Sequence, residues 1–290
     1  MNVKPVALTF LILFTFPGLC FPESTLIATK VDNPPIVDGN WQDTAWDNAK
    51  ELITRDNTAN LDISIKSVYS NEKIFLLVRF HDPNESRLHK AWKWNKQEEI
   101  YEVGPQREDC VVFKWAMDER TPDLSVHADT PYTADIWFWK ANRTDPIGYA
   151  DDKIQHLSPI KLAKSMKLRS KSGNTMFLQR KGDKGKSAYK SKLYVDYVGD
   201  EIPQFEKQNP SKSRADIKAK GVWNNNQWCI EFSRPLKTYQ EDDVQFEVSK
   251  KFFFGVSRYE IAGRKPDPKL SQPLYGSGDV SDKLFLVFNN

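Results

Sequence analysis

The 290-residue chain has little of the chemistry on which most enzymes depend. It contains three cysteines and four histidines, and it has no Cys-x-x-Cys and no His-Glu-x-x-His pair. A structural zinc site and a covalently attached c-type haem are therefore not expected. The chain also lacks the two glycine-rich phosphate loops and the Gly-x-Ser-x-Gly elbow, so neither a bound nucleotide nor a serine hydrolase is indicated.

No long hydrophobic run occurs after the first twenty residues. Lys4 is followed by the uncharged apolar stretch Val6–Phe16 and a Pro-Gly break, which is typical of a secretory signal peptide and too short to span a bilayer. We expect a signal peptide over residues 1–22 and an exported, periplasmic chain with no membrane span after cleavage. An uncleaved N-terminal anchor and a lipoprotein attached at Cys20 remain as alternatives.

Export leaves two cysteines, Cys110 and Cys229, both in stretches that are typical of strands. An oxidising compartment permits a disulfide between them if the two strands are neighbours. The alternative is a pair of separate buried thiols.

Short apolar stretches with alternating polarity dominate the rest of the chain. Ile63 to Tyr69 and Lys73 to Phe80 flank a polar turn and predict a hairpin. No long segment has a clean helical period, and only residues 43–49 suggest a helical turn, which would bury Trp46. We therefore predict an all-β fold, an antiparallel β-sandwich of the immunoglobulin-like or DOMON-like kind. The further predicted strands are 110–115, 134–140, 222–223 with 227–232, 252–259 and 283–288.

One segment departs from this pattern. Residues 161–220 hold sixteen Lys or Arg against six Asp or Glu, which leaves the remainder of the mature chain acidic. We interpret this segment as a Lys-rich insertion in a single domain over residues 23–290, since long loops in compact domains are functional or disordered. It is either a solvated loop or a rim that meets an anionic ligand or an acidic partner. Nucleic acid is a poor partner for an exported protein.

Tryptophans are abundant, with nine in the chain. Alternation places Trp137 and Trp139 on one face of a strand, either in the core or as a wall beside a planar ligand. His127 lies in a loop ten residues before Trp137, where a lone histidine is usually solvated, although neutral imidazole is a standard axial ligand of haem iron. The acidic pairs Asp151-Asp152 and Asp242-Asp243 flank predicted turns, and nothing specific supports them as glycosidase catalysts.

Four separated stretches resemble one known family, the haem-binding domain of ethylbenzene dehydrogenase gamma subunits and related periplasmic cytochromes. Its opening motif is also seen in family 9 carbohydrate-binding modules and DOMON-like sandwiches. The stretches are Pro35-Ile36-Val37-Asp38-Gly39 with Trp46; Tyr101–Pro105 with Arg107-Glu108-Asp109; Ala134–Thr144 with Gly148–Asp152; and Asp216–Trp223 with Trp228, Glu231, Arg234-Pro235-Leu236 and Asp242–Phe246.

The resemblance implies a β-sandwich that holds one haem between loops with two axial side chains. One ligand precedes the Trp-x-Trp-Lys-Ala strand, which indicates His127 with Met117 as the second choice. The other follows the penultimate strand, which indicates Lys265 as a neutral amine. The absence of Cys-x-x-Cys-His implies non-covalent haem b, and histidine in place of the gamma subunits' methionine lowers the reduction potential.

The resemblance further implies that Trp137 and Trp139 line the pocket, and that Arg143 and the Lys-rich insertion contact the haem propionates. The chain is then an electron-transfer protein or redox-complex subunit rather than a catalyst. It would relay electrons to or from a periplasmic oxidoreductase, such as a molybdenum enzyme with iron–sulfur subunits, or a c-type cytochrome. The alternatives are a carbohydrate- or surface-binding module with exposed tryptophans and, less favoured, a glycan-active enzyme that uses an Asp pair.

Overall fold

The computed structural model describes residues 24–56, 61–258 and 283–289. The signal peptide predicted over residues 1–22 lies outside this part of the chain. The described residues form eighteen strands and three short 3-10 helices, without an α-helix, and none of these helices is long and apolar enough to cross a membrane. The elements are β1 (Ser24–Lys30), η1 (Thr44–Trp46), β2 (Leu52–Asp56), β3 (Leu61–Tyr69), β4 (Lys73–His81), β5 (Trp92–Asn95), β6 (Ile100–Val103), β7 (Cys110–Ala116), β8 (Tyr132–Lys140), η2 (Asp145–Ile147), β9 (Asp151–Ser158), β10 (Met166–Arg169), β11 (Thr175–Gly182), β12 (Tyr189–Ser191), β13 (Glu201–Ile202), β14 (Phe205–Lys207), η3 (Lys212–Ala215), β15 (Lys218–Asn224), β16 (Gln227–Pro235), β17 (Phe252–Ser257) and β18 (Leu284–Asn289).

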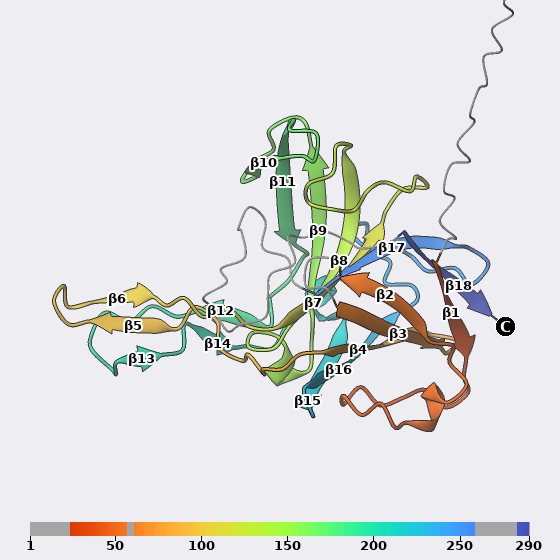
Figure 1. The fold of residues 1–290 in the computed structure, drawn as a ribbon, viewed down its shortest axis with the longest axis horizontal. Helices are drawn as coiled ribbons and strands as arrows, with labels where there is room; N and C mark the ends of the chain where they lie inside the picture. The colour runs from red at the N-terminus through yellow and green to blue at the C-terminus, as the bar shows by residue number, and fades with distance from the viewer. Residues whose placement is uncertain (1–23, 57–60, 259–282, 290) are drawn as a thin grey trace, which may run out of the picture.

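Thirteen strands form one continuous sheet in the order β10-β11-β9-β8-β7-β17-β18-β1-β3-β4-β16-β15, with β2 added beside β3 (Figure 1). Strands from distant places in this order face each other. The ring of Phe113 in β7 lies 5.4 Å from that of Phe232 in β16, and Trp139 in β8 lies 4.9 Å from Trp228 in β16. The sheet therefore folds back on itself into two packed layers, and the predicted β-sandwich is confirmed.

The strands predicted from alternating polarity are present. β3 and β4 form the predicted antiparallel hairpin, with Ile63 paired to Phe80 and Tyr69 to Ile74. Alternate residues of both strands lie in the main core, and Phe75 and Leu77 on the other face of β4 are buried as well. The helical turn also forms, as η1, and it buries Trp46.

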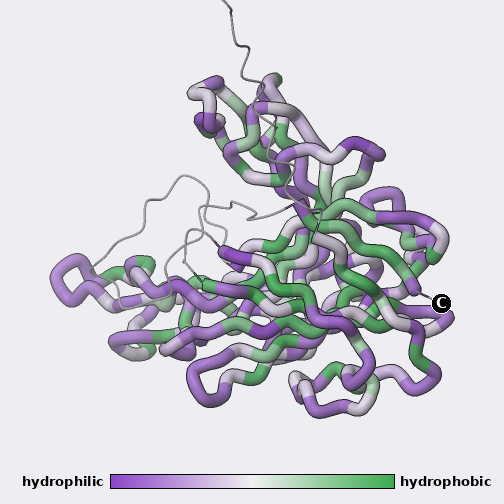
Figure 2. The backbone as a smooth tube through the Cα atoms, turned by 45° about the vertical axis from the view of Figure 1, so that its right-hand side comes forward, coloured by the Kyte–Doolittle hydropathy of each residue, from purple (hydrophilic) through white to green (hydrophobic). Residues whose placement is uncertain are grey.

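The Lys-rich insertion is more ordered than a loop. β10 and β11 extend the main sheet beside β9, while β13 pairs with β5 in a separate three-stranded sheet that projects from the body as an arm (Figure 1). The sequence prediction missed these strands and β9, because their residues are mostly charged or polar. Figure 2 shows hydrophobic stretches gathered in the middle of the molecule and hydrophilic ones at its loops.

The two cysteines of the described chain are buried and unpaired. Cys110 packs among the side chains outside β7 and β8, whereas Cys229 packs outside β3 and β4. They belong to different hydrophobic clusters, so the alternative of two separate buried thiols holds, and the disulfide does not form.

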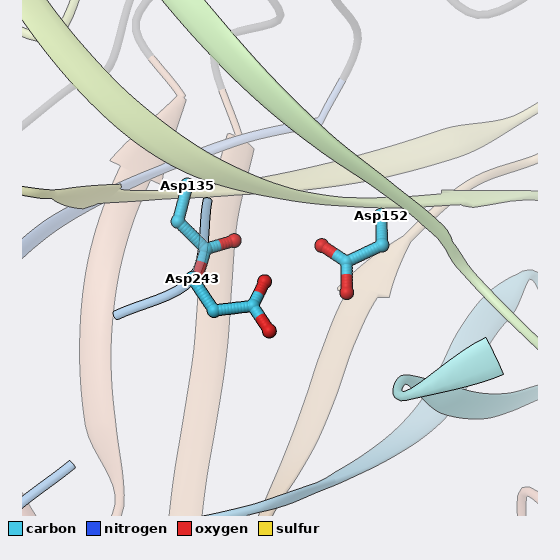
Figure 3. Close-up of side chains that lie close together, drawn as sticks. All are labelled: Asp135, Asp152 and Asp243. Atoms are coloured by element: carbon cyan, nitrogen blue, oxygen red, sulfur yellow. The ribbon is translucent and has the colours of Figure 1, made fainter. Parts of the chain in front are cut away.

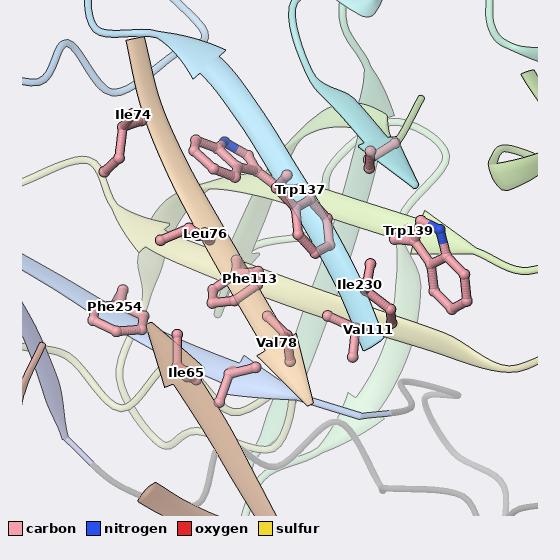
Figure 4. Close-up of a cluster of buried hydrophobic side chains, with 14 of the residues drawn as sticks. Ile65, Ile74, Leu76, Val78, Val111, Phe113, Trp137, Trp139, Ile230 and Phe254 are labelled. Atoms are coloured by element: carbon pink, nitrogen blue, oxygen red, sulfur yellow. The ribbon is translucent and has the colours of Figure 1, made fainter. Parts of the chain in front are cut away.

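The main core lies between the two layers and is rich in aromatic rings (Figure 4). Trp115 stacks on Phe254 at 4.8 Å and packs against Trp137 at 5.2 Å. Gly221 in β15 is needed here, because a Cβ at this position would come within 2.5 Å of the Trp139 ring. The close approach of β15 to β8 therefore depends on a residue without a side chain.

Glu231 in β16 fastens the N-terminal segment to the sheet. Its carboxylate accepts the indole N–H of Trp46 at 2.8 Å and the backbone N–H groups of Asp38 and Gly39 at 3.0 and 2.8 Å. The side chain of Glu231 is buried. One carboxylate therefore satisfies three donors, of which those of Gly39 and Trp46 are buried, from a segment almost two hundred residues away in the chain.

We expect Glu231→Ala to lower the free energy of unfolding by about 2 to 4 kcal/mol, because it leaves three donors without an acceptor. Urea unfolding followed by tryptophan fluorescence measures this. The control is Glu247→Ala, which removes an exposed carboxylate and should change the value by less than about 0.5 kcal/mol. Equal losses in the two variants would contradict the role given to Glu231.

The same residue makes stability depend on pH. Burial raises the pKa of Glu231 from 4.5 to about 7, so the folded protein binds this proton more tightly than the unfolded chain does. The resulting stabilisation is complete below pH 4.5 and is lost as the pH rises through about 7. We expect the free energy of unfolding to fall with rising pH over this range, and to fall less steeply in Glu231→Gln. Asp109, whose pKa burial also raises to about 7, should preserve part of the slope.

Candidate functional site

Trp137 and Trp139 lie on the same face of β8, as their spacing predicts, and both are completely buried in the main core. Figure 4 shows them with Phe113 and Phe254 of their own layer and with aliphatic side chains of β3, β4 and β16 in the opposite layer. The Trp139 indole donates to Asp145 at 3.0 Å, and Trp137 packs under the Arg234 guanidinium at 4.8 Å. Among the described residues these rings serve the core rather than a surface.

Met117 directly follows β7 and lines a cavity of ≈ 310 Å³. Its side chain is half-buried and packs against the main core, on the face that carries Trp137. The cavity also has Phe252 and Phe253 in its wall, and Lys250 and Lys251 contribute cations to its lining. The lining also holds the carboxylates of Asp118, Glu119 and Asp243, so a thioether and two aromatic residues meet there with charges of both signs.

His156, a histidine that the sequence prediction did not single out, lies two strands across the sheet from Met117. The backbone N–H of Met117 donates to the Thr133 carbonyl at 3.2 Å, and Thr133 pairs with His156 of β9 in the next step across the sheet. Thr133 Oγ1 lies 3.0 Å from Nδ1 of His156, so the two side chains share a face. Burial lowers the pKa of His156, and its ring lines a second cavity of ≈ 460 Å³.

His127 is placed elsewhere. Its neighbours Val126 and Ala128 pack with Phe138, on the face of β8 opposite to Trp137. The His127 ring is held by a 2.9 Å contact between Nδ1 and the Arg169 carbonyl. Because a carbonyl only accepts, Nδ1 is the donor and the neutral ring keeps its lone pair on Nε2, which is the tautomer that metal-binding histidines use. The structure thus places His127 away from Trp137 but leaves its Nε2 with a lone pair that can bind a metal.

Arg143 follows the other end of β8. Thr133 and Lys140 stand at opposite ends of this strand, roughly 20 Å apart at the rise of a β-strand, so Arg143 is remote from Met117. Its guanidinium is ion-paired with the buried Glu108 and lies over the Tyr189 ring at 5.2 Å. The structure therefore does not bring Arg143 and Met117 together. Lys265, the other predicted iron ligand, lies outside the described residues.

Carboxylates that the sequence prediction placed beside turns converge inside the sandwich. Asp152 lies in β9 rather than in a turn, and one oxygen each from Asp135, Asp152 and Asp243 lies within 4.8 Å of the others (Figure 3). Burial and the neighbouring Asp135 raise the pKa of Asp152 well above its ordinary value. The sequence alone could not show that these carboxylates meet, because the three residues are far apart in it. The pairing of β8 with β9 is what brings Asp135 and Asp152 together.

Two solved structures of a family 9 carbohydrate-binding module from Caldicellulosiruptor kristjanssonii, in complex with cellotriose and with glucose, are similar to this chain. The identities are 11% and 12%, the TM-scores 0.39 and 0.40, and the alignments cover 92% of this chain and 95% and 96% of those chains. At these values the likeness says nothing about what this chain binds. None of the curated proteins matches it significantly.

The family model described as ethylbenzene dehydrogenase matches residues 38–264. This range begins at Asp38, within the opening motif that Glu231 holds, and includes the Trp-rich β8, the acidic β9 and all of β16. Because the match spans most of the sequence, the chain belongs to the ethylbenzene dehydrogenase family.

Proposed function

We propose that this protein is an exported haem b protein that passes electrons to or from a periplasmic oxidoreductase, and that it performs no substrate chemistry itself. Membership of the family supports the class of function. The observation that supports a particular site is the cavity at Met117, where a thioether lies beside the aromatic residues Phe252 and Phe253. Export is supported by the apolar N-terminal sequence.

Side chains of the kinds that ligate haem iron occur at this end of the sandwich. Thioether sulfur and neutral imidazole are both axial ligands of haem iron, and an apolar surrounding favours binding of the macrocycle. Met117 offers the thioether, while His127 and His156 offer imidazole from opposite faces of the sheet. When bound, haem would supply a one-electron ferric–ferrous couple.

The chain's own residues would position the group and tune it. Phe252 and Phe253 supply the aromatic part of the cavity's lining, and apolar surroundings favour the less charged ferrous form. Lys250 and Lys251 are the cations in the lining of the Met117 cavity. Lys250 pairs with Glu247 at 3.0 Å and Lys251 lies over the Phe285 ring, so either would have to leave this contact to meet a carboxylate of a ligand held there, while Arg143 is remote. Lys265 remains a candidate for the second axial position.

Reconstitution with haemin tests the proposal. We expect the purified protein to take up one haem per chain and to give a six-coordinate low-spin visible spectrum that dithionite reduces reversibly. A protein that stays colourless both from haem-replete cells and after addition of haemin would refute the haem proposal.

Single variants identify the axial ligands. We expect Met117→Ala to weaken haem binding by about tenfold or more and to convert the spectrum toward a five-coordinate form. His127→Ala, His156→Ala and Lys265→Ala are compared in the same assay, and the variant that shifts the Soret band identifies the partner of Met117. Exposed Met166 and His81 provide the matched controls, Met166→Ala and His81→Ala. If none of the four test variants differs from these controls, the proposed ligand set is wrong.

A second candidate function rests on the arm. Trp94 packs edge-on against Tyr101 at 4.9 Å and against Tyr197 at 5.3 Å, and Tyr197 is largely exposed. Such a cluster of rings suits stacking on a sugar face, whereas the buried Trp137 and Trp139 do not. Quenching of tryptophan fluorescence by soluble oligosaccharides, abolished in Trp94→Ala and absent for haemin, would favour a carbohydrate-binding module instead.

A further inference from the structure

Three aspartates from separate parts of the chain meet between the layers of the sandwich. Asp135 projects from β8 and Asp152 from β9, and the cross-strand partner of Asp152 is Trp137, two residues beyond Asp135. Asp243 comes from the connection between β16 and β17, residues 236–251. Figure 3 shows the three carboxylates directed toward a common space. Asp183 and Asp242 form a second acidic group that shares Asp243.

The oxygens of this cluster lack the partners that buried carboxylates require. Asp135 and Asp152 are completely buried, and Asp243 is 4% exposed. Neither oxygen of Asp152, neither oxygen of Asp243 and only one oxygen of Asp135 has a hydrogen bond from the protein. A buried carboxylate without donors costs several kcal/mol, so an unpartnered Asp152 directed into the cluster points to a ligand rather than to a structural role.

The positive charge nearby is insufficient. Arg234 from β16 is the cation that faces the cluster in the described chain: it pairs with Asp135 and lies 3.8 Å from Asp243. Its second terminal nitrogen donates to the Val244 carbonyl. One guanidinium thus faces three buried carboxylates, and two further acidic residues lie beside Asp243.

We propose that Asp135, Asp152 and Asp243 bind one Ca²⁺ ion. The ligands are all carboxylate oxygens, which select hard cations over zinc or copper. Ca²⁺ accepts six to eight oxygens in flexible geometry, whereas Mg²⁺ demands a strict octahedron and keeps most of its water. Several convergent carboxylates therefore favour calcium.

The ion would join the two layers at a place that matters for the Met117 cavity. Asp135 and Asp152 belong to the β8–β9 pair, and Asp243 belongs to the 236–251 connection. Asp243, Val244 and Gln245 also line the Met117 cavity. Binding of Ca²⁺ would thus fix one wall of that cavity against the sheet. The site stands on its own residues and does not depend on whether haem is bound.

Terbium luminescence and thermal unfolding test the site in haem-free protein. We expect Tb³⁺ bound at the cluster to be sensitised by the neighbouring Trp137, and Ca²⁺ to displace it with a dissociation constant of about 0.1 to 1 mM, as in extracellular calcium modules. Ca²⁺ should raise the melting temperature of chelator-treated protein, and Mg²⁺ at the same concentration should raise it far less.

Asp152→Asn keeps the shape of the side chain and removes its charge. We expect this variant and Asp243→Asn to lose at least about tenfold in Ca²⁺ affinity and to lose the Ca²⁺-dependent rise in melting temperature. The control is Asp118→Asn, because Asp118 lines the Met117 cavity but lies outside the cluster. This variant should behave like the wild type.

The opposite result is equally clear. If the carboxyls hold protons instead of a cation, neither Tb³⁺ nor Ca²⁺ at about 10 mM, well above the range of extracellular sites, affects the wild type. Asp152→Asn is then more stable than the wild type at neutral pH with or without Ca²⁺. Equal Ca²⁺ binding by Asp152→Asn and the wild type would also overturn the proposal.

Discussion

Pairs of buried tryptophan and carboxylate hold this sandwich together. Each indole N–H donates to an acidic side chain that is itself buried, and each pair joins segments or layers of the fold. Because both partners are desolvated, a pair is stable only when the carboxylate finds further donors. The pairs are Trp46 with Glu231, Trp139 with Asp145, and Trp228 with Asp109.

These pairs explain why the family motifs are recognisable at all. Glu231 joins the opening motif to the last one, and Asp145 joins the Trp-rich strand to the backbone N–H of Gly221 in β15. The motifs therefore record the constraints of the sandwich more than those of a ligand. The candidate ligands of a bound group are therefore residues that lie outside these motifs, above all Met117 and His127.

The sequence predicts the sandwich well where polarity alternates, as in β3, β4, β7, β8 and β16. It does not predict β9 to β11, because their residues are polar and their pairing depends on neighbours that come earlier in the chain. Spacing placed Trp137 and Trp139 on one face but could not decide whether a ligand or the opposite layer covers that face. The sequence could not place Met117 and His127 either, because both precede β8 in a stretch of loop. The register of β7, β8 and β9 shows that Met117 shares a face of the sheet with His156. The loop that carries His127 packs on the opposite face.

Hydrogen bonding separates the structural acids from the cluster of Asp135, Asp152 and Asp243. Both oxygens of Glu231 accept N–H donors, and both oxygens of Asp145 are bonded, to Trp139 and Gly221 on one side and to Arg87 and Lys220 on the other. The fold thus has the means to satisfy a buried carboxylate from the backbone and from cationic side chains. Asp152 lies in the same interior with no donor on either oxygen. Burial and the neighbouring carboxylates raise the pKa of Asp152 well above its ordinary value, so without a cation this side chain is held as the neutral acid. An ionised Asp152 needs a counter-charge, which the proposed Ca²⁺ shared with Asp135 and Asp243 would supply.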